Sequence, residues 1–167
     1  MNLWSAGCTV DYSSGSTHIL AAMCDLTGFI LLEAVSDITA ANLSTVFMQN
    51  FLLKVGLCGL IVVDAHSVFR SQFEALCAVL ELPLHPAARG NHKAVSVERF
   101  FRFLNKVTTI TANDRDTNEI FVQSAHCAAY AWNSSPIDST GIVRSVAAVG
   151  REFKFPLDIK LADAPTP

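Results

Sequence analysis

Three acidic residues of this chain, Asp11, Asp64 and Glu98, have the type and spacing of a metal site that acts on phosphate groups. Asp11 lies at the end of a short segment that begins at Cys8, Asp64 ends an apolar run, and Glu98 lies one turn into a segment with helical periodicity. Carboxylates from separate elements form a hard, all-oxygen ligand set that suits Mg²⁺ or Mn²⁺. Two such ions about 4 Å apart could activate a water or a 3′ hydroxyl and stabilise the leaving oxygen of a phosphodiester.

The three acids also have a simpler interpretation. The chain has 15 acidic residues, and aspartates at the ends of strands are common turn formers. The pattern alone therefore leaves both interpretations open.

The region around Glu98 is more basic than the rest of the chain. It contains Arg89, Lys93, Arg99, Arg102 and Lys106 with one acid, whereas the remaining residues hold 7 basic and 14 acidic groups. A basic loop that enters a helix holding one acid would suit a metal-dependent enzyme that acts on a phosphate backbone.

Apolar residues at helical spacing predict a helix over 94–106. They are Val97, Phe100, Phe101, Leu104 and Val107. Glu98 lies at the edge of this stripe, so we expect its carboxylate to be half desolvated and to need a cation beside it. The alternative is a surface amphipathic helix in which Glu98 pairs with Arg102 one turn on.

Five basic or histidine side chains near the acids are candidates for contact with DNA phosphates. Arg89, His92 and Lys93 fall in the loop before the helix, where the alternative is a solvated loop. Arg102 and Lys106 are expected to face outward on the helix, where the alternative is a solubilising surface.

Length and composition predict one folded domain. The chain has 167 residues, of which 51% are hydrophobic and 16% charged, and this excludes disorder. No apolar run approaches the roughly 18 residues of a membrane span, and no basic segment suggests a secretory signal. A net charge of −3 argues against a protein that coats nucleic acid generally. The five cysteines show no zinc spacing and are expected to be reduced core residues.

The order of apolar segments predicts a mixed α/β sheet with helices on its faces. Strands are expected at 8–12, 19–24 and 29–34 as an antiparallel meander, then at 57–63 and 82–84. Helices are expected from Thr39 to Gly56, around Phe69–Leu80, and over 94–106, 120–132 and 145–149. If the first and fourth strands are neighbours, Asp11 and Asp64 leave the sheet at the same edge, where open α/β sheets place their sites.

Five segments resemble the catalytic core of a retroelement integrase, and are most similar to integrases of long-terminal-repeat retrotransposons. They are Val10-Asp-Tyr12, Ala22–Phe29, Leu60–Phe69, Asn91–Lys106 with Val97-Glu-Arg-Phe100, and Tyr130-Ala-Trp-Asn-Ser-Ser-Pro136 through Glu152. The resemblance implies an RNase H-like fold over 1–159 with an extended tail at 160–167. It also implies that Asp11, Asp64 and Glu98 are the catalytic, metal-binding triad, and that Asp25 matches an acid without a catalytic role.

The resemblance further implies a function. It implies two Mg²⁺ or Mn²⁺ ions, 3′ processing and strand transfer of element DNA into target DNA, and double-stranded DNA as the partner. Integrases work as multimers, so a homo-oligomer is expected, with no membrane association. The expected location is intracellular, in cytoplasmic particles before integration and in the nucleus when the protein acts on chromosomal DNA.

Some features depart from the family pattern. Ala65-His66 stand where the family has Asn-Gly or Arg-Gly, and the gap from Asp64 to Glu98 is a little short. His66 is either a surface group or one that crowds the metal site. The zinc-binding and basic flanking domains of integrases are not in this sequence. The alternative function is therefore a catalytically inactive RNase H-like remnant that binds DNA or protein. A doubly wound small-ligand binder is disfavoured because no glycine-rich loop follows the first strand.

Overall fold

The computed structural model describes residues 3–9, 17–63, 72–86, 95–111 and 118–154. The strands are β1 (Leu3–Thr9), β2 (His18–Cys24), β3 (Ile30–Val35), β4 (Leu60–Val63) and β5 (Leu84–Pro86). The helices are α1 (Ala40–Phe47), the π-helix η1 (Met48–Leu52), α2 (Leu53–Val55), α3 (Gln72–Val79), α4 (Val95–Thr111), α5 (Asn118–Asn133) and α6 (Arg144–Val149).

The five strands form one mixed sheet in the order β3-β2-β1-β4-β5. β1, β2 and β3 are an antiparallel meander, while β4 runs parallel to β1 and β5 parallel to β4. In the β1–β4 pair Leu3 lies opposite Leu60 and Ala6 opposite Val63. The predicted fold class is therefore confirmed, and the condition that the first and fourth strands are neighbours is met.

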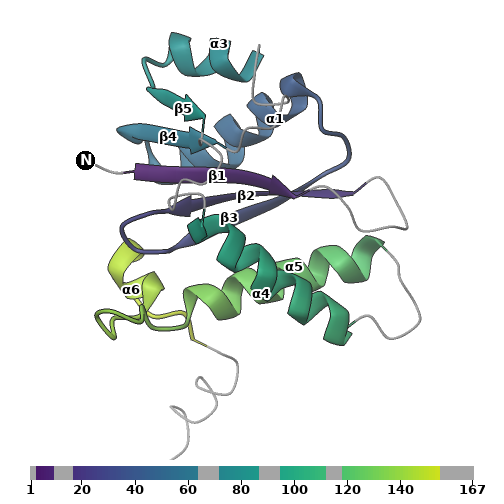
Figure 1. Cartoon of the computed structure of the whole chain (residues 1–167), viewed down its shortest axis with the longest axis vertical. Helices are drawn as coiled ribbons and strands as arrows, with labels where there is room; N and C mark the ends of the chain where they lie inside the picture. Colours follow the sequence, from purple (N-terminus) through teal and green to yellow (C-terminus); the bar gives the residue numbers. More distant parts are fainter. Residues whose placement is uncertain (1–2, 10–16, 64–71, 87–94, 112–117, 155–167) are drawn as a thin grey trace, which may run out of the picture.

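Helices cover both faces of the sheet, with α1 and α3 above it and α4 and α5 below it in Figure 1. Alternate residues of β2 account for the two layers, since side chains along a strand point to opposite faces. Leu20 and Ala22 pack with Phe47, Phe51 and Phe73 on one side. On the other side the core contains these residues of β2, α4 and α5: Ile19, Ala21, Met23, Val97, Phe100, Phe101, Leu104, Ala125, Ala128 and Ala129.

Several element boundaries differ from the predictions. The first strand begins at Leu3 and is described to Thr9, whereas 8–12 was predicted. Its residues Ser5, Ala6 and Gly7 are small and show no hydrophobic alternation, so pairing with β2 and β4 defines the strand. α4 continues five residues beyond the predicted end at Lys106, to Thr111. β4 begins at Leu60, three residues after the predicted start.

The connection from α1 to β4 begins and ends with local signals that the sequence predicts. The Thr39 hydroxyl accepts a hydrogen bond from the Asn42 amide and caps α1, and Gly56 ends α2 with φ of 86°. The predicted single helix is instead divided by the π-helical turn η1. No helix within the described residues is long and apolar enough to cross a membrane.

Three of the four cysteines with described side chains are buried, as expected, whereas Cys127 is exposed on α5. Burial raises the pKa of the Cys77 thiol to about 11, so this thiol is neutral and unreactive at pH 7. Burial likewise raises the pKa of Cys58. All four are free thiols, and the predicted core position is wrong for Cys127 alone among them.

The end of α5 is fixed against the turn between β2 and β3. The Trp132 Nε1–H donates to the Gly28 carbonyl at 2.9 Å, and the Arg144 guanidinium lies 4.5 Å from the centre of the Trp132 ring. Arg144 also donates to the hydroxyl and carbonyl oxygens of Ser135. Gly28 has φ of 67°, and a Cβ there would come within 3.0 Å of the Arg144 Nε. The positive φ therefore favours glycine at residue 28, and a side chain there would also displace the Arg144 guanidinium.

Candidate active site

The elements that carry the three predicted metal ligands lie next to one another. β1 and β4 are adjacent and parallel, so their carboxyl ends lie at the same edge of the sheet. α4 packs against β1 and β2 and carries Glu98 in its first turn. Asp11 and Asp64 themselves lie outside the described residues, so their side chains are not placed. The condition that the two strands are neighbours is met. The convergence of the three carboxylates stays a prediction.

Glu98 is more exposed than its sequence context predicts. Its side chain is 62% exposed, and Oε2 lies 3.8 Å from an Arg102 nitrogen. Its place on the helix explains this exposure. Val97 belongs to the buried stripe, and Glu98, the next residue, is rotated about 100° around the helix axis, so it points away from the sheet. The expected half-desolvated carboxylate is therefore wrong, and the predicted pairing with Arg102 is present.

The Glu98–Arg102 pair is weak. Both side chains are mostly exposed, at 62% and 69%, and exposed pairs contribute about 0–1 kcal/mol. The Glu98 carboxylate is thus open to solvent and is not committed to its partner. A carboxylate in this state can accept a hard cation, whereas one buried in a tight ion pair could not.

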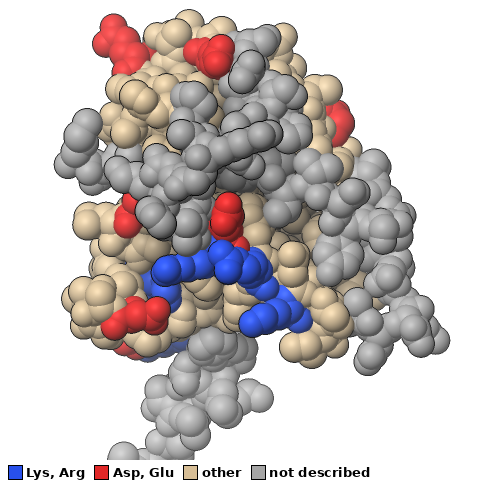
Figure 2. Space-filling model, viewed as in Figure 1, with Lys and Arg blue, Asp and Glu red and all other residues tan. Residues whose placement is uncertain are grey.

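The outer face of α4 is a basic stripe of three residues: Arg99, Arg102 and Lys106. All three are exposed, and their spacing of three and then four residues puts them on one side of the helix. Figure 2 shows the Lys and Arg side chains as a band across the face of the molecule where α4 lies. Arg102 and Lys106 face outward as predicted. Arg99 was not among the predicted DNA contacts, although its spacing from Arg102 could have identified it.

Other predicted contacts cannot be compared with the structure. Arg89, His92 and Lys93, as well as His66, lie outside the described residues. Within the described ranges no group of three His, Cys, Asp or Glu side chains comes together, and two of the three predicted ligands lie outside these ranges.

An apolar pocket lies on the opposite layer of the sheet from α4. Its lining includes Phe47, Phe51, Val55 and the buried Cys58, and its walls hold no charged side chain. Such a pocket offers no oxygen ligand for a hard metal ion such as Mg²⁺ and no contact for a phosphate. The basic stripe on α4 is therefore the better candidate for substrate binding.

Known structures share the architecture described above. The catalytic core domain of BIV integrase matches with a TM-score of 0.69 at 19% identity, over 89% of this chain and 93% of that one. The HTLV-2 integrase catalytic core domain, solved in complex with magnesium in a trimeric form, matches with a TM-score of 0.66 at 16% identity, over 87% and 95%.

A chain of a larger integrase assembly also shares this fold. The simian T-cell lymphotropic virus intasome, in complex with the PP2A regulatory subunit B56 gamma, matches with a TM-score of 0.70 at 14% identity. That match covers 92% of this chain and 56% of the other. No protein-family model and no curated protein sequence matches this chain. The chain therefore has the fold of retroviral integrase catalytic cores, an RNase H-like fold, as the sequence resemblance implied.

Proposed function

We propose that this chain is the catalytic core of a metal-dependent polynucleotidyl transferase, which processes DNA 3′ ends and joins them to target DNA as an integrase does. The observation that carries the proposal is the arrangement of β1, β4 and α4 in an integrase-core fold, with Glu98 in the first turn of α4. The sequence places Asp64 directly after β4 and Asp11 two residues after the described end of β1. Function belongs to the site and not to the fold alone, so these three acids are what must be tested.

Asp11, Asp64 and Glu98 would hold two Mg²⁺ or Mn²⁺ ions. Three carboxylates supply the oxygen ligands that these ions prefer, and the exposed Glu98 side chain is accessible to an ion. When bound, the ions would activate the attacking oxygen and stabilise the leaving oxygen of the phosphodiester. Glu98 would be a ligand of a bound ion. The stripe of Arg99, Arg102 and Lys106 would bind DNA phosphates and so position the DNA strand.

We further propose that the chain acts as a homo-oligomer on double-stranded DNA, within the cell and finally in the nucleus, and that it comes from a long-terminal-repeat retrotransposon. The trimeric form of the HTLV-2 core and the intasome of the simian virus support an oligomer. The origin rests on the sequence resemblance alone.

A second candidate is an inactive RNase H-like module that binds DNA or protein. The observation in its favour is that Ala65-His66 follow Asp64, where integrases have Asn-Gly or Arg-Gly. The two candidates differ in metal binding. Isothermal calorimetry with Mg²⁺ and Mn²⁺, followed by a disintegration assay on branched DNA, separates them. Binding in the millimolar range and metal-dependent strand joining support the transferase, whereas DNA binding without either supports the inactive module.

DNA binding through α4 predicts a change in salt dependence. Replacing Arg99, Arg102 and Lys106 with glutamine is expected to weaken DNA binding and to flatten the plot of log K against log salt concentration. Each lost phosphate contact lowers the slope by about 0.9, so the triple variant lowers it by up to ~2.7. Fluorescence anisotropy with a labelled duplex over a salt series measures this slope.

The matched control is Lys54→Gln, because Lys54 is exposed on α2, in the layer on the other side of the sheet. Its slope should stay within about 0.3 of the unmodified chain, well below one phosphate contact. If the slope fell by the same amount per removed charge in the control and in the α4 variant, net charge and not this stripe would govern DNA binding.

A further inference from the structure

The outer edge of β3 has backbone groups that face away from the sheet. β3 is the end strand, next to β2. The Cys24 amide donates to the Phe29 carbonyl at 2.9 Å, so Cys24 and Phe29 form a hydrogen-bonded pair. In an antiparallel ladder such pairs alternate with non-hydrogen-bonded pairs. Leu31, Glu33 and Val35 therefore bond to β2, and Ile30, Leu32 and Ala34 turn their amide and carbonyl groups outward.

One end of this edge is occupied by a side chain. The Asn133 carboxamide accepts from the Ile30 amide at 2.8 Å and donates to the Ile30 carbonyl at 2.8 Å. These two bonds are those that a neighbouring strand would make. They confirm that the outward groups of β3 have the geometry for strand pairing, and they stop any added strand at Ile30.

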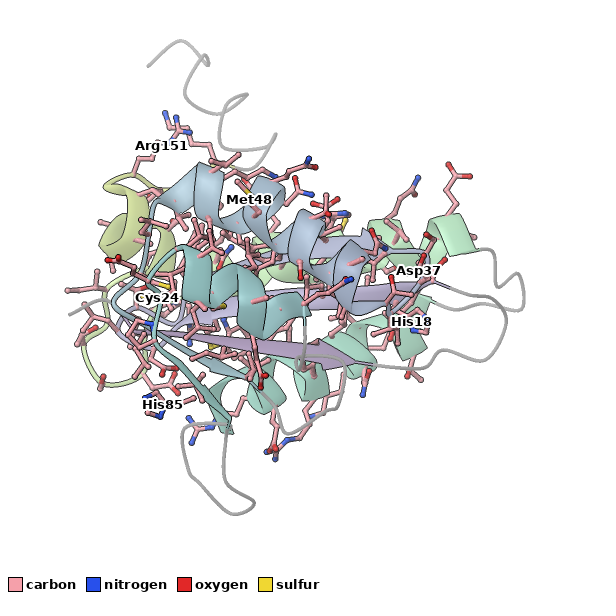
Figure 3. The ribbon with its side chains drawn as sticks, turned by 90° about the horizontal axis from the view of Figure 1, so that it is seen from above. His18, Cys24, Asp37, Met48, His85 and Arg151 are labelled. Atoms are coloured by element: carbon pink, nitrogen blue, oxygen red, sulfur yellow. The ribbon has the colours of Figure 1, made fainter. Side chains whose placement is uncertain are left out.

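The rest of the edge has no such partner among the described residues. No described group bonds to the outward amides and carbonyls of Leu32 and Ala34. Leu32 is buried and Ala34 half-buried, with Glu33 half-buried between them. Asp37, which Figure 3 shows beside His18, follows the far end of β3. Unpaired edges invite another strand, and proteins normally cover or blunt them.

The charge of Glu33 indicates which strand would fit. Its carboxylate forms no ion pair with a described residue. A strand added to this edge meets Glu33 at a non-hydrogen-bonded pair, where facing side chains are closest. A lysine or arginine there would be favourable, and a like charge unfavourable. A second copy that pairs Leu32 with Ala34 of its partner would place the two Glu33 carboxylates opposite each other, so self-pairing is disfavoured.

We propose that the edge of β3 at Leu32–Ala34 binds an extended segment of a partner protein, which adds as a sixth strand and presents a basic residue to Glu33. The bonds that form are the backbone hydrogen bonds of Leu32 and Ala34, and the ion pair with Glu33 selects the segment. The site lies on a different strand from those that precede the catalytic aspartates, so the proposal does not depend on the transferase activity.

The test is amide hydrogen exchange followed by NMR on the whole chain. In the free protein the Leu32 and Ala34 amides should exchange at least about tenfold faster than those of Leu31 and Glu33, which bond to β2. The probe is the capped peptide Thr-Val-Lys-Val-Thr, whose two valines face Leu32 and Ala34 and whose lysine faces Glu33. Saturating peptide should slow exchange at Leu32 and Ala34 by at least about tenfold.

Two controls test the backbone bonds and the charge separately. The same peptide with N-methylated valines cannot donate these bonds and should give no protection. A peptide with glutamate at its centre should bind more weakly, by between about twofold and about thirtyfold, and Glu33→Lys should reverse that preference, whereas Glu74→Lys on α3 should not. The two peptides on the unmodified chain already test the charge, so the proposal does not rest on folding of the variant.

Four results would overturn the proposal. Slow exchange at Leu32 and Ala34 in the dilute free chain would mean that the edge is already covered. Protection that rises with protein concentration alone would identify a second copy as the occupant. Equal protection by the methylated peptide, or none by any peptide, would exclude strand addition.

Discussion

Replacing Glu98 with glutamine is expected to abolish metal-dependent strand joining and to leave the chain folded. Glutamine keeps the size of the side chain but removes the charge that would hold the ions. Loss of a group that only supports a metal ligand costs about 10–100-fold, so loss of the ligand itself should cost at least ~100-fold. The disintegration assay with Mn²⁺ measures the effect, and calorimetry on the same variant should show weaker metal binding.

The structure predicts that this loss is not a folding defect. The Glu98 side chain is 62% exposed, and its contact with Arg102 at 3.8 Å is worth at most about 1 kcal/mol. The matched control is Glu119→Gln, since Glu119 is also an exposed acid in the first turn of a helix, α5. It should join strands at the unmodified rate. Unchanged joining by the Glu98 variant would remove this residue from the active site and with it the proposed mechanism.

The elements around the site could be predicted from the sequence because their signals are local. The apolar run 19–24 and the stripe from Val97 to Val107 each bury one face, and Thr39 and Gly56 have the side chain or the backbone freedom that a helix end needs. The order of strands followed from the short turns of the meander and from the resemblance. The adjacency of β1 and β4 depends on pairing between distant segments. The sequence could therefore not predict it, and the convergence of Asp11 and Asp64 was stated only for the case that the two strands are neighbours.

The first strand shows where local reasoning fails. β1 consists largely of small and polar residues, Leu-Trp-Ser-Ala-Gly-Cys-Thr, and it forms because it has ladder partners on both sides. Context between strands overrides intrinsic preference in this way. The exposure of Glu98 was wrong for a related reason. A neighbour of the apolar stripe lies either beside the core or in solvent, and about 100° of helix rotation decides which.

The contacts of Trp132 and Asn133 could not be predicted at all. Trp132 bonds to Gly28 and Asn133 to Ile30, more than a hundred residues away in the chain. Nothing in a single sequence links Asn133 to a strand edge, because asparagine at the end of a helix is ordinary. Asn133 can bond to Ile30 because the backbone groups of Ile30 face away from β2, and that orientation is set only in the folded sheet.

Replacing Phe100 with alanine is expected to lower the stability of the fold strongly. Phe100 is 0% exposed in the core between α4, α5 and the sheet, and its ring lies 5.8 Å from that of Phe101 and 5.7 Å from that of Trp132. Removing a buried phenylalanine leaves a cavity and costs about 3–5 kcal/mol. Since domains are stable by only about 5–15 kcal/mol, the free energy of unfolding should fall by about a fifth or more. Urea denaturation followed by circular dichroism measures it.

Phe103→Ala separates burial from the loss of an aromatic ring on the same helix. Phe103 also lies 5.7 Å from the Trp132 ring, but its side chain is only half-buried. The Phe103→Ala substitution should lower the free energy of unfolding by about 1–2 kcal/mol, because less apolar area is exposed and water can fill the space. Because Phe100 holds α4 against β2, DNA joining by the Phe100 variant should fall with the folded fraction. Equal destabilisation by the two variants would mean that α4 is not anchored at Phe100, and that Glu98 and the basic stripe are positioned by other contacts.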